Sequence, residues 1–221
     1  MKNDFNDNRF INVLTKMGNA LYLNILFILC SLPVFTLGAS LCGYYYGMVK
    51  VVRRDRSYAA REFFAEFKRS FAKATVFTLL MLIAIVLLWF DREYFAYSGR
   101  QFAFVAVAVL DVIVIIAAFF IVWIFPVVSR FTGSYKELIK FTFVISFKHI
   151  LITVILLLGL LACIYLCVRF PVSFTLIIPA GWCYASTIFI EPVFKKYIKE
   201  PGENEDGWYY DSDEENGKDK K

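Results

Sequence analysis

Long apolar segments constrain this chain more than any other feature of its sequence. Five of them occupy residues 17–49, 74–90, 102–128, 150–168 and 170–190, and only one holds a charged residue. Each is near or above the roughly 18 residues at which a segment becomes a transmembrane candidate. In lipid a span must satisfy its own backbone hydrogen bonds, and these lengths suit helices rather than the ~10-residue strands of a barrel. We therefore predict an all-α, polytopic transmembrane helical bundle in a cell membrane.

The first apolar segment is too long for one straight crossing. Residues 17–49 would reach about 50 Å as a single helix, whereas a bilayer core is about 30 Å thick. Pro33 disfavours helical geometry in the residue before it and lacks an N–H, and Gly38 gives the chain freedom to restart. We predict two short helices, at about 17–32 and 38–52, and so six membrane segments. A single tilted span, giving five, is the alternative.

The distribution of Lys and Arg orients the bundle. The strongest basic cluster lies between residues 50 and 73, weaker clusters lie at 129–140 and 195–199, and the first sixteen residues are also basic. Residues 91–100 balance two acids against two bases. Because cytoplasmic loops collect basic residues, we expect both termini in the cytoplasm and residues 91–100 outside.

A basic, aromatic stretch precedes the second apolar segment. Residues 57–73 place four Phe on one helical face, with Arg61, Lys68 and Arg69 elsewhere. This pattern is typical of a helix that lies in the inner-leaflet interface; docking of a cytoplasmic partner is the alternative. Up to residue 199 the chain carries 21 basic and 10 acidic residues, which favours contact with anionic lipid at the inner face and not with nucleic acid.

Two further patterns concern the interior of the bundle. Ala39, Gly43 and Gly47 recur every four residues, and such a stripe lets helices approach closely in lipid. Asp111 lies about ten residues into its segment, which places it near mid-membrane, where an acid is costly and usually functional. We expect either a proton, cation or substrate site there, or a carboxyl that is neutral or hydrogen-bonded to a neighbouring helix. Glu191 lies near the inner boundary, where it can reach towards Lys195.

The remaining features set limits on function. Residues 200–221 hold nine acids and three bases with almost no aliphatic residues, so we expect a disordered cytoplasmic tail after a membrane domain at 1–199. The sequence contains no phosphate-binding glycine loop, no metal-ligand cluster and no nucleophile paired with its one histidine. The five cysteines lie in apolar segments and fit small buried hydrophobes. We therefore expect neither an enzyme nor a cofactor.

Two stretches carry a resemblance to a known family. They are NRFINVLTKMGNALYLNILFILCSLPVFTLGAS (8–40) and YYYGMVKVVRRDRSYAAREFFAEFKRSFAKAT (44–75). Together they resemble the YesL family of bacterial integral membrane proteins, most specifically over residues 8–80 and more loosely to about 199. Members of that family often neighbour genes for carbohydrate uptake, including sugar ABC transporters and two-component regulators. The resemblance implies a role linked to carbohydrate use, and it supplies no catalytic residues.

Two functions fit these observations. The first is an accessory membrane protein that associates with a sugar ABC transporter or a membrane sensor through its basic helices and small-residue face. The second is a small secondary transporter or channel, with Asp111 and the broken first pair of helices lining the path, because discontinuous helices and mid-membrane acids are what such transporters use.

Overall fold

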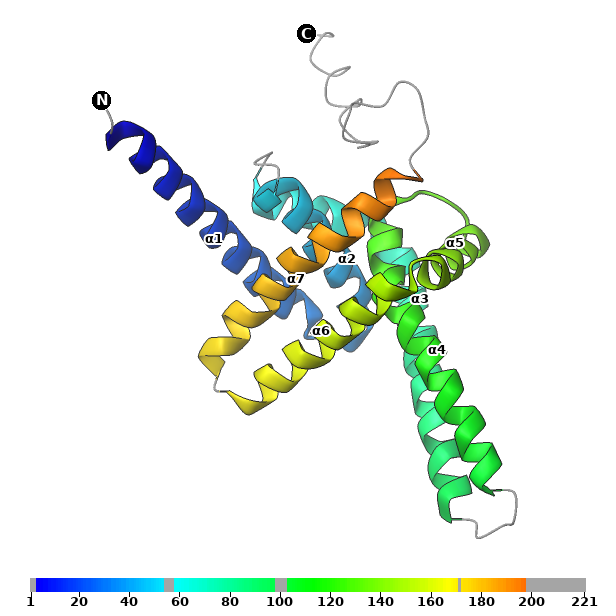
Figure 1. Cartoon of the computed structure of the whole chain (residues 1–221). Coiled ribbons are helices and arrows are strands. Elements are labelled where there is room, and N and C mark those ends of the chain that lie inside the picture. Colours follow the sequence, from blue (N-terminus) through cyan, green and yellow to red (C-terminus); the bar gives the residue numbers. More distant parts are fainter. Residues whose placement is uncertain (1–2, 54–57, 98–102, 171, 198–221) are drawn as a thin grey trace.

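The chain folds into helices throughout its described part, as the sequence predicts (Figure 1). The computed structural model describes residues 3–53, 58–97, 103–170 and 172–197; the predicted disordered tail lies outside them. No strand is present in these ranges. The α-helices are α1 (Asn3–Ser31), α2 (Leu37–Gly47), α3 (Ala59–Tyr97), α4 (Ala103–Arg130), α5 (Tyr135–Lys148), α6 (Ile150–Arg169) and α7 (Val172–Lys195).

Five of the described helices, α1, α3, α4, α6 and α7, are long and apolar enough to cross a membrane. The chain is therefore a multi-pass membrane protein in contact with the lipid bilayer. The sixth predicted segment is α2, which continues as the π-helix η2 (Met48–Arg53). It is shorter than the five, but it lies deepest: the residues of α2 are buried except for Leu37 and Leu41.

The break between the first two helices falls at Pro33. α1 ends at Ser31, Pro33 is extended (φ −75°, ψ 117°), and a 3₁₀ turn, η1 (Val34–Thr36), leads into α2. The Thr36 hydroxyl lies 2.6 Å from the carbonyl oxygen of Cys30 and 2.7 Å from that of Pro33, which ties the turn to the end of α1. α1 starts well before the predicted residue 17, because the polar stretch before it contains neither Gly nor Pro to stop a helix.

Gly38 is the second residue of α2, close to the predicted restart of the helix, and it also serves close packing. It lies inside α2, where a Cβ atom would overlap the Thr78 hydroxyl and approach the Phe125 ring to 2.5 Å. Thr78 belongs to α3 and Phe125 to α4. The missing side chain therefore lets the α2 backbone approach both helices.

The stretch 57–73 does not form a separate interfacial helix. Residues from Ala59 onward continue without interruption into the second long span, so that α3 reaches Tyr97. No Gly or Pro lies between these two residues, and a helix continues where nothing ends it. Phe63 is fully buried, whereas Arg61 and Lys68 are exposed.

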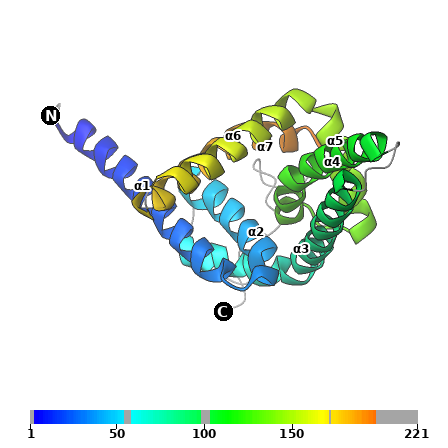
Figure 2. The same cartoon turned by 90° about the horizontal axis from the view of Figure 1, so that it is seen from below.

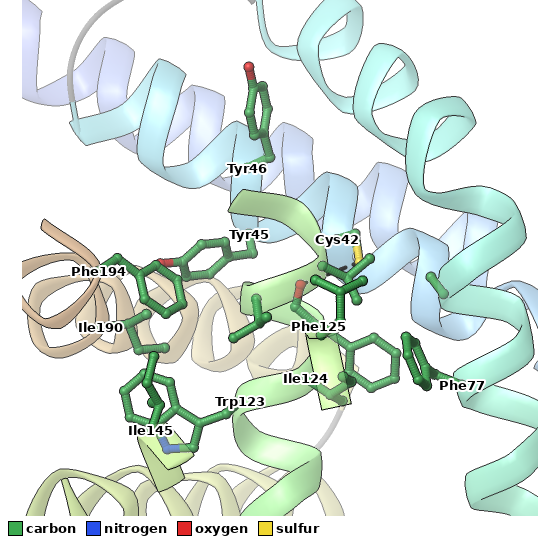
Figure 3. Packing of buried hydrophobic residues seen from close by; sticks show 14 of the residues in the cluster. Cys42, Tyr45, Tyr46, Phe77, Trp123, Ile124, Phe125, Ile145, Ile190 and Phe194 are labelled. Carbon is green, nitrogen blue, oxygen red and sulfur yellow. Dashed lines mark hydrogen bonds between the residues drawn. The ribbon is translucent and has the colours of Figure 1, made fainter. Parts of the chain in front are cut away.

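The core lies where α2 meets α3, α4 and α7. Trp123, Phe125 and Phe194 are among its largest members, and Figure 3 shows them around α2 together with Cys42 and Tyr45. The view from below shows α1, α3, α4 and α6 around α2 (Figure 2). From this common region the α3–α4 and α6–α7 hairpins extend in different directions (Figure 1).

The ends of the helices sort into two groups. The starts of α1 and α3 and the ends of α4 and α7 lie at the upper side of Figure 1, whereas the end of α3 and the start of α4 lie at the lower side. α1 runs downward and α2 returns upward. α1 and α2 are therefore antiparallel, as a hairpin at Pro33 requires. Since α2 is not among the five described helices that are long enough to span, the six-segment topology stays a prediction.

Candidate functional site: a buried charge network

Three carboxylates of the described residues are buried at the upper end of the bundle, and each has a cationic partner. Glu62 and Glu66 lie on the first turns of α3, and Glu191 lies on the last turns of α7. Burial of a charge is costly unless the charge is paired and hydrogen-bonded. The three pairs therefore mark the side chains whose burial without a partner would cost this fold the most free energy.

The deepest pair joins α4 to α7. Arg130 Nε and Nη2 donate to the two carboxylate oxygens of Glu191 at 3.1 Å each, and both side chains are almost completely buried. The Tyr45 hydroxyl of α2 donates to Glu191 Oε1 at 2.9 Å. A bidentate guanidinium and a third donor give this carboxylate the geometry of a strong charge-assisted contact. The cluster thus fixes three helices relative to one another.

A second group of contacts joins α3 to α4. Arg69 Nε donates to Glu66 Oε2 at 2.7 Å, and Arg69 Nη2 donates to the carbonyl oxygen of Ser129 at 2.7 Å. Ser70 donates to the other oxygen of Glu66. Arg69, which we expected in the lipid interface, is thus turned toward the bundle. One turn along, Lys73 Nζ donates to the Gly133 carbonyl oxygen at 2.8 Å, so the start of α3 is fixed along the end of α4.

The third pair lies beside a cavity. Lys50 Nζ is 3.2 Å from Glu62 Oε2, and both side chains are about nine-tenths buried. The two residues line a cavity of about 290 Å³, together with Tyr46, Arg61, Glu66 and Arg69 among others. Arg53 extends the contacts to α7, because its Nη1 donates to the Thr187 carbonyl oxygen at 2.8 Å.

The three pairs and their hydrogen-bond partners together form the charge network. The sequence singles out two acids, Asp111 and Glu191, and of these Glu191 belongs to the network. It bonds to Arg130 and Tyr45 and does not reach towards Lys195, as we had expected. The reason is geometric: the Glu191 side chain lies on the inner face of α7, where its exposed fraction is 1%, whereas Lys195 is exposed.

Asp111 lies far from the network and is paired with Arg92 of α3. Arg92 Nε lies 3.1 Å from Asp111 Oδ1, and the two side chains are about half exposed. The stretch from Lys73 to Arg92 on α3 contains as many residues as the stretch from Asp111 to Arg130 on α4. Each stretch corresponds to about 28 Å of helix, which is nearly the full bilayer core of about 30 Å. Measured from Lys73 and Arg130, the Arg92–Asp111 pair therefore lies at the far end of a stretch of bilayer length on both helices, whereas the sequence predicts Asp111 near mid-membrane. The exposed Trp89 and Tyr94 nearby suit an interfacial aromatic belt.

The small-residue stripe of α2 lies against two other helices. A Cβ on Gly43 would lie 2.8 Å from the Phe63 carbonyl oxygen of α3, and one on Gly47 would lie 2.7 Å from a Leu23 methyl group of α1. Ala39 is completely buried. These positions bring backbones close, which is how van der Waals packing holds helices together in lipid.

Four members of the network are not predicted from the sequence alone: Tyr45, Glu62, Glu66 and Arg130. One signal was available for the two acids, because they stand at i and i+4 within a basic stretch, and residues so spaced share a helix face. Nothing in the local sequence marks Tyr45 or Arg130, since their partner lies on a distant segment.

The chemistry of the network is electrostatic. Among the described residues no three His, Cys, Asp or Glu side chains gather in a way that could hold a metal ion. Each buried carboxylate is held by a cation from another element or another turn: Glu62 by Lys50, Glu66 by Arg69 and Glu191 by Arg130. Removing one partner of such a pair leaves an uncompensated buried charge, so the network acts first as a lock between helices.

Comparison with known proteins gives one match. No curated protein and no solved structure matches the chain. Residues 20–92, about a third of the chain, match the model of a family described as "Protein of unknown function, DUF624". The matched stretch runs from α1 through α2 and η2 into α3. It covers the Pro33 break, the α2 stripe and the acids of the network that lie on α3, and the similarity is limited to this part of the chain.

Proposed function

We propose that this multi-pass membrane protein is a non-enzymatic accessory component of a membrane complex that serves carbohydrate uptake or sensing. One observation carries the accessory role: the buried carboxylates of the described residues are bound to cations of the same chain, most completely in the Arg130–Glu191–Tyr45 cluster. Side chains committed in this way hold helices together. A sugar pathway needs polar groups that can exchange partners with a passing solute.

The outer surface supports the same proposal. Much of α4 and α6 is exposed and apolar within this chain, with Val112, Leu151 and Leu158 as examples. In a membrane such surfaces contact either lipid or the helices of another protein, and helices associate there through packing. The diverging α3–α4 and α6–α7 hairpins offer such surfaces on several sides (Figure 1).

The link to carbohydrates rests on the resemblance of residues 8–80 to the YesL family. It directs the choice of partner to test, which is a sugar ABC transporter or a membrane-bound sensor of the same cell. No residue of this chain is assigned to sugar recognition.

The decisive experiment compares association with transport. A photo-crosslinking amino acid at Leu158, which is exposed on α6, should capture a subunit of a sugar permease or sensor from native membranes in cells grown on the relevant sugar. The same substitution at Leu156, which is 1% exposed, is the matched control and should capture nothing. Purified protein in proteoliposomes should take up no sugar above the level of empty vesicles. Sugar uptake by the purified protein would overturn the accessory role.

A second candidate, a small secondary transporter, is favoured by the interrupted helices. The Pro33 break and the π-helical η2 interrupt what would otherwise be regular segments next to the buried charges, and such interruptions occur at transport sites. If this candidate is correct, proteoliposome uptake should fall when Asp111→Asn is introduced, a substitution that should leave the fold intact.

A further inference from the structure

An apolar groove runs between α1 and α7 at a place that the charge network does not use. It has a volume of about 420 Å³, and its lining includes Ala20 of α1, Val52 of η2, and Ala180, Gly181 and Tyr184 of α7. Of the described residues that line it, Lys16 is basic. A Cβ atom built on Gly181 would meet nothing within 4 Å, so the groove is open at this point.

The ends of the groove differ in charge. α1 and α2 pack side by side with Leu23 against Gly47, and because they are antiparallel, Lys16 lies on the level of Val52 and Arg53, about two turns further along. Arg53 bonds to the Thr187 carbonyl oxygen of α7, one turn beyond Tyr184. Two cationic side chains from different elements thus lie toward one end. Val13 lies beyond Lys16 on α1, and the rest of the apolar lining continues away from the two cations along both helices.

This polarity fits one occupant. We propose that the groove binds an anionic phospholipid of the leaflet on the side where α1 begins, with an acyl chain along Ala20, Ala180 and Gly181 and the phosphate at the level of Lys16 and Arg53. A cationic end and an apolar shaft, set parallel to membrane helices, reproduce the order of headgroup and chain in a leaflet. Up to residue 199 the chain carries 21 basic and 10 acidic residues. This surplus of basic residues also favours an anionic lipid, because anionic lipid is attracted to basic residues at a membrane surface.

The test counts lipids bound to the purified protein by native mass spectrometry, with phosphatidylglycerol and phosphatidylcholine as probes. Gly181→Leu fills the open point of the groove and should remove one tightly bound phosphatidylglycerol. Gly18→Leu is the matched control, since Gly18 on α1 also has free space around it and lies outside the groove lining; it should bind lipid like the wild type. Thermal unfolding of both variants in detergent checks that they fold.

A second variant tests the headgroup end without touching the packing. Lys16→Gln should keep the bound lipid but lower the preference for phosphatidylglycerol over phosphatidylcholine about five-fold, the effect of losing one basic residue near an anionic surface. The proposal is overturned if Gly181→Leu retains the same lipids as wild type. It is equally overturned if Gly181→Leu dissociates a dimer, which would make a second copy the occupant, or if glycerol phosphate alone displaces the lipid.

Discussion

Arg130 and Glu191 stand 61 residues apart in the sequence, yet the guanidinium of one faces the carboxylate of the other through two contacts of 3.1 Å. Both side chains are almost completely buried. A bidentate pair of this kind fixes the end of α4 against the end of α7, and these two helices belong to different hairpins. The stability of the whole bundle should therefore depend on it.

Breaking this pair from either side should be strongly destabilising. Glu191→Gln or Arg130→Met leaves a buried charge without its partner, which costs about 3–5 kcal/mol, whereas replacing both residues with apolar ones is often neutral. In detergent, the double variant Arg130→Met/Glu191→Leu should thus unfold at about the same temperature as the wild type, and both single variants should unfold at lower temperatures. Single variants as stable as the wild type would show that the pair is not a lock.

The hydroxyl of Tyr45 should contribute to the same lock. It donates to Glu191 Oε1 at 2.9 Å, and a hydrogen bond to a charged group contributes about 1.5–3 kcal/mol. Tyr45→Phe should lower the unfolding temperature in detergent, whereas Tyr165→Phe should leave it unchanged, because Tyr165 is 66% exposed. Equal behaviour of the two variants would remove Tyr45 from the network.

Gly43 should not tolerate a side chain. A Cβ there would lie 2.8 Å from the Phe63 carbonyl oxygen, and overpacking typically costs about 1–3 kcal/mol. Because leucine is favourable in a membrane span, Gly43→Leu should insert normally and unfold at a lower temperature. Gly18→Leu is the control, since nothing lies near its added atoms. If both variants unfold like the wild type, α2 and α3 do not pack through Gly43.

Asp111 should matter far less for stability than Glu191 does. Its pair with Arg92 is about half exposed, and exposed ion pairs contribute about 0–1 kcal/mol. Asp111→Asn should therefore shift the unfolding temperature only slightly, and the charge exchange Arg92→Asp/Asp111→Arg should behave like the wild type. A loss as large as that of Glu191→Gln would mean that another protein or helix covers this pair in the membrane.

The sequence predicts the helical spans because their determinants are local. An uncharged run of about 20 residues identifies a span on its own. The break at Pro33 follows from the effect of proline on the adjacent backbone, although Pro126 of α4 and Pro179 and Pro192 of α7 lie inside helices. The same locality explains the packing glycines Gly43 and Gly47, whose spacing is visible in five letters of sequence.

The charge network could not be predicted because its pairs depend on the register of distant helices. Arg130 and Glu191 meet only if α4 and α7 cross at one depth, and no local pattern fixes that depth. The continuation of α3 to Tyr97 is a related case. Hydropathy falls at Asp91, which suggests a loop, but a fall in hydropathy does not end a helix, and the extra turns bring Arg92 to Asp111.

The most direct test of the six-segment topology is cysteine labelling with a membrane-impermeant maleimide. Asn12→Cys on α1 and Thr132→Cys after α4 occupy exposed positions and should react only after the membrane is permeabilised. Two further variants should react in intact cells: Val34→Cys at the bend and Phe170→Cys after α6. The residues that they replace are 57% and 45% exposed. The wild type is the control, because its five cysteines lie in the apolar segments. Labelling of Asn12→Cys in intact cells, with Thr132→Cys still protected, would contradict the hairpin at Pro33 and leave five spans.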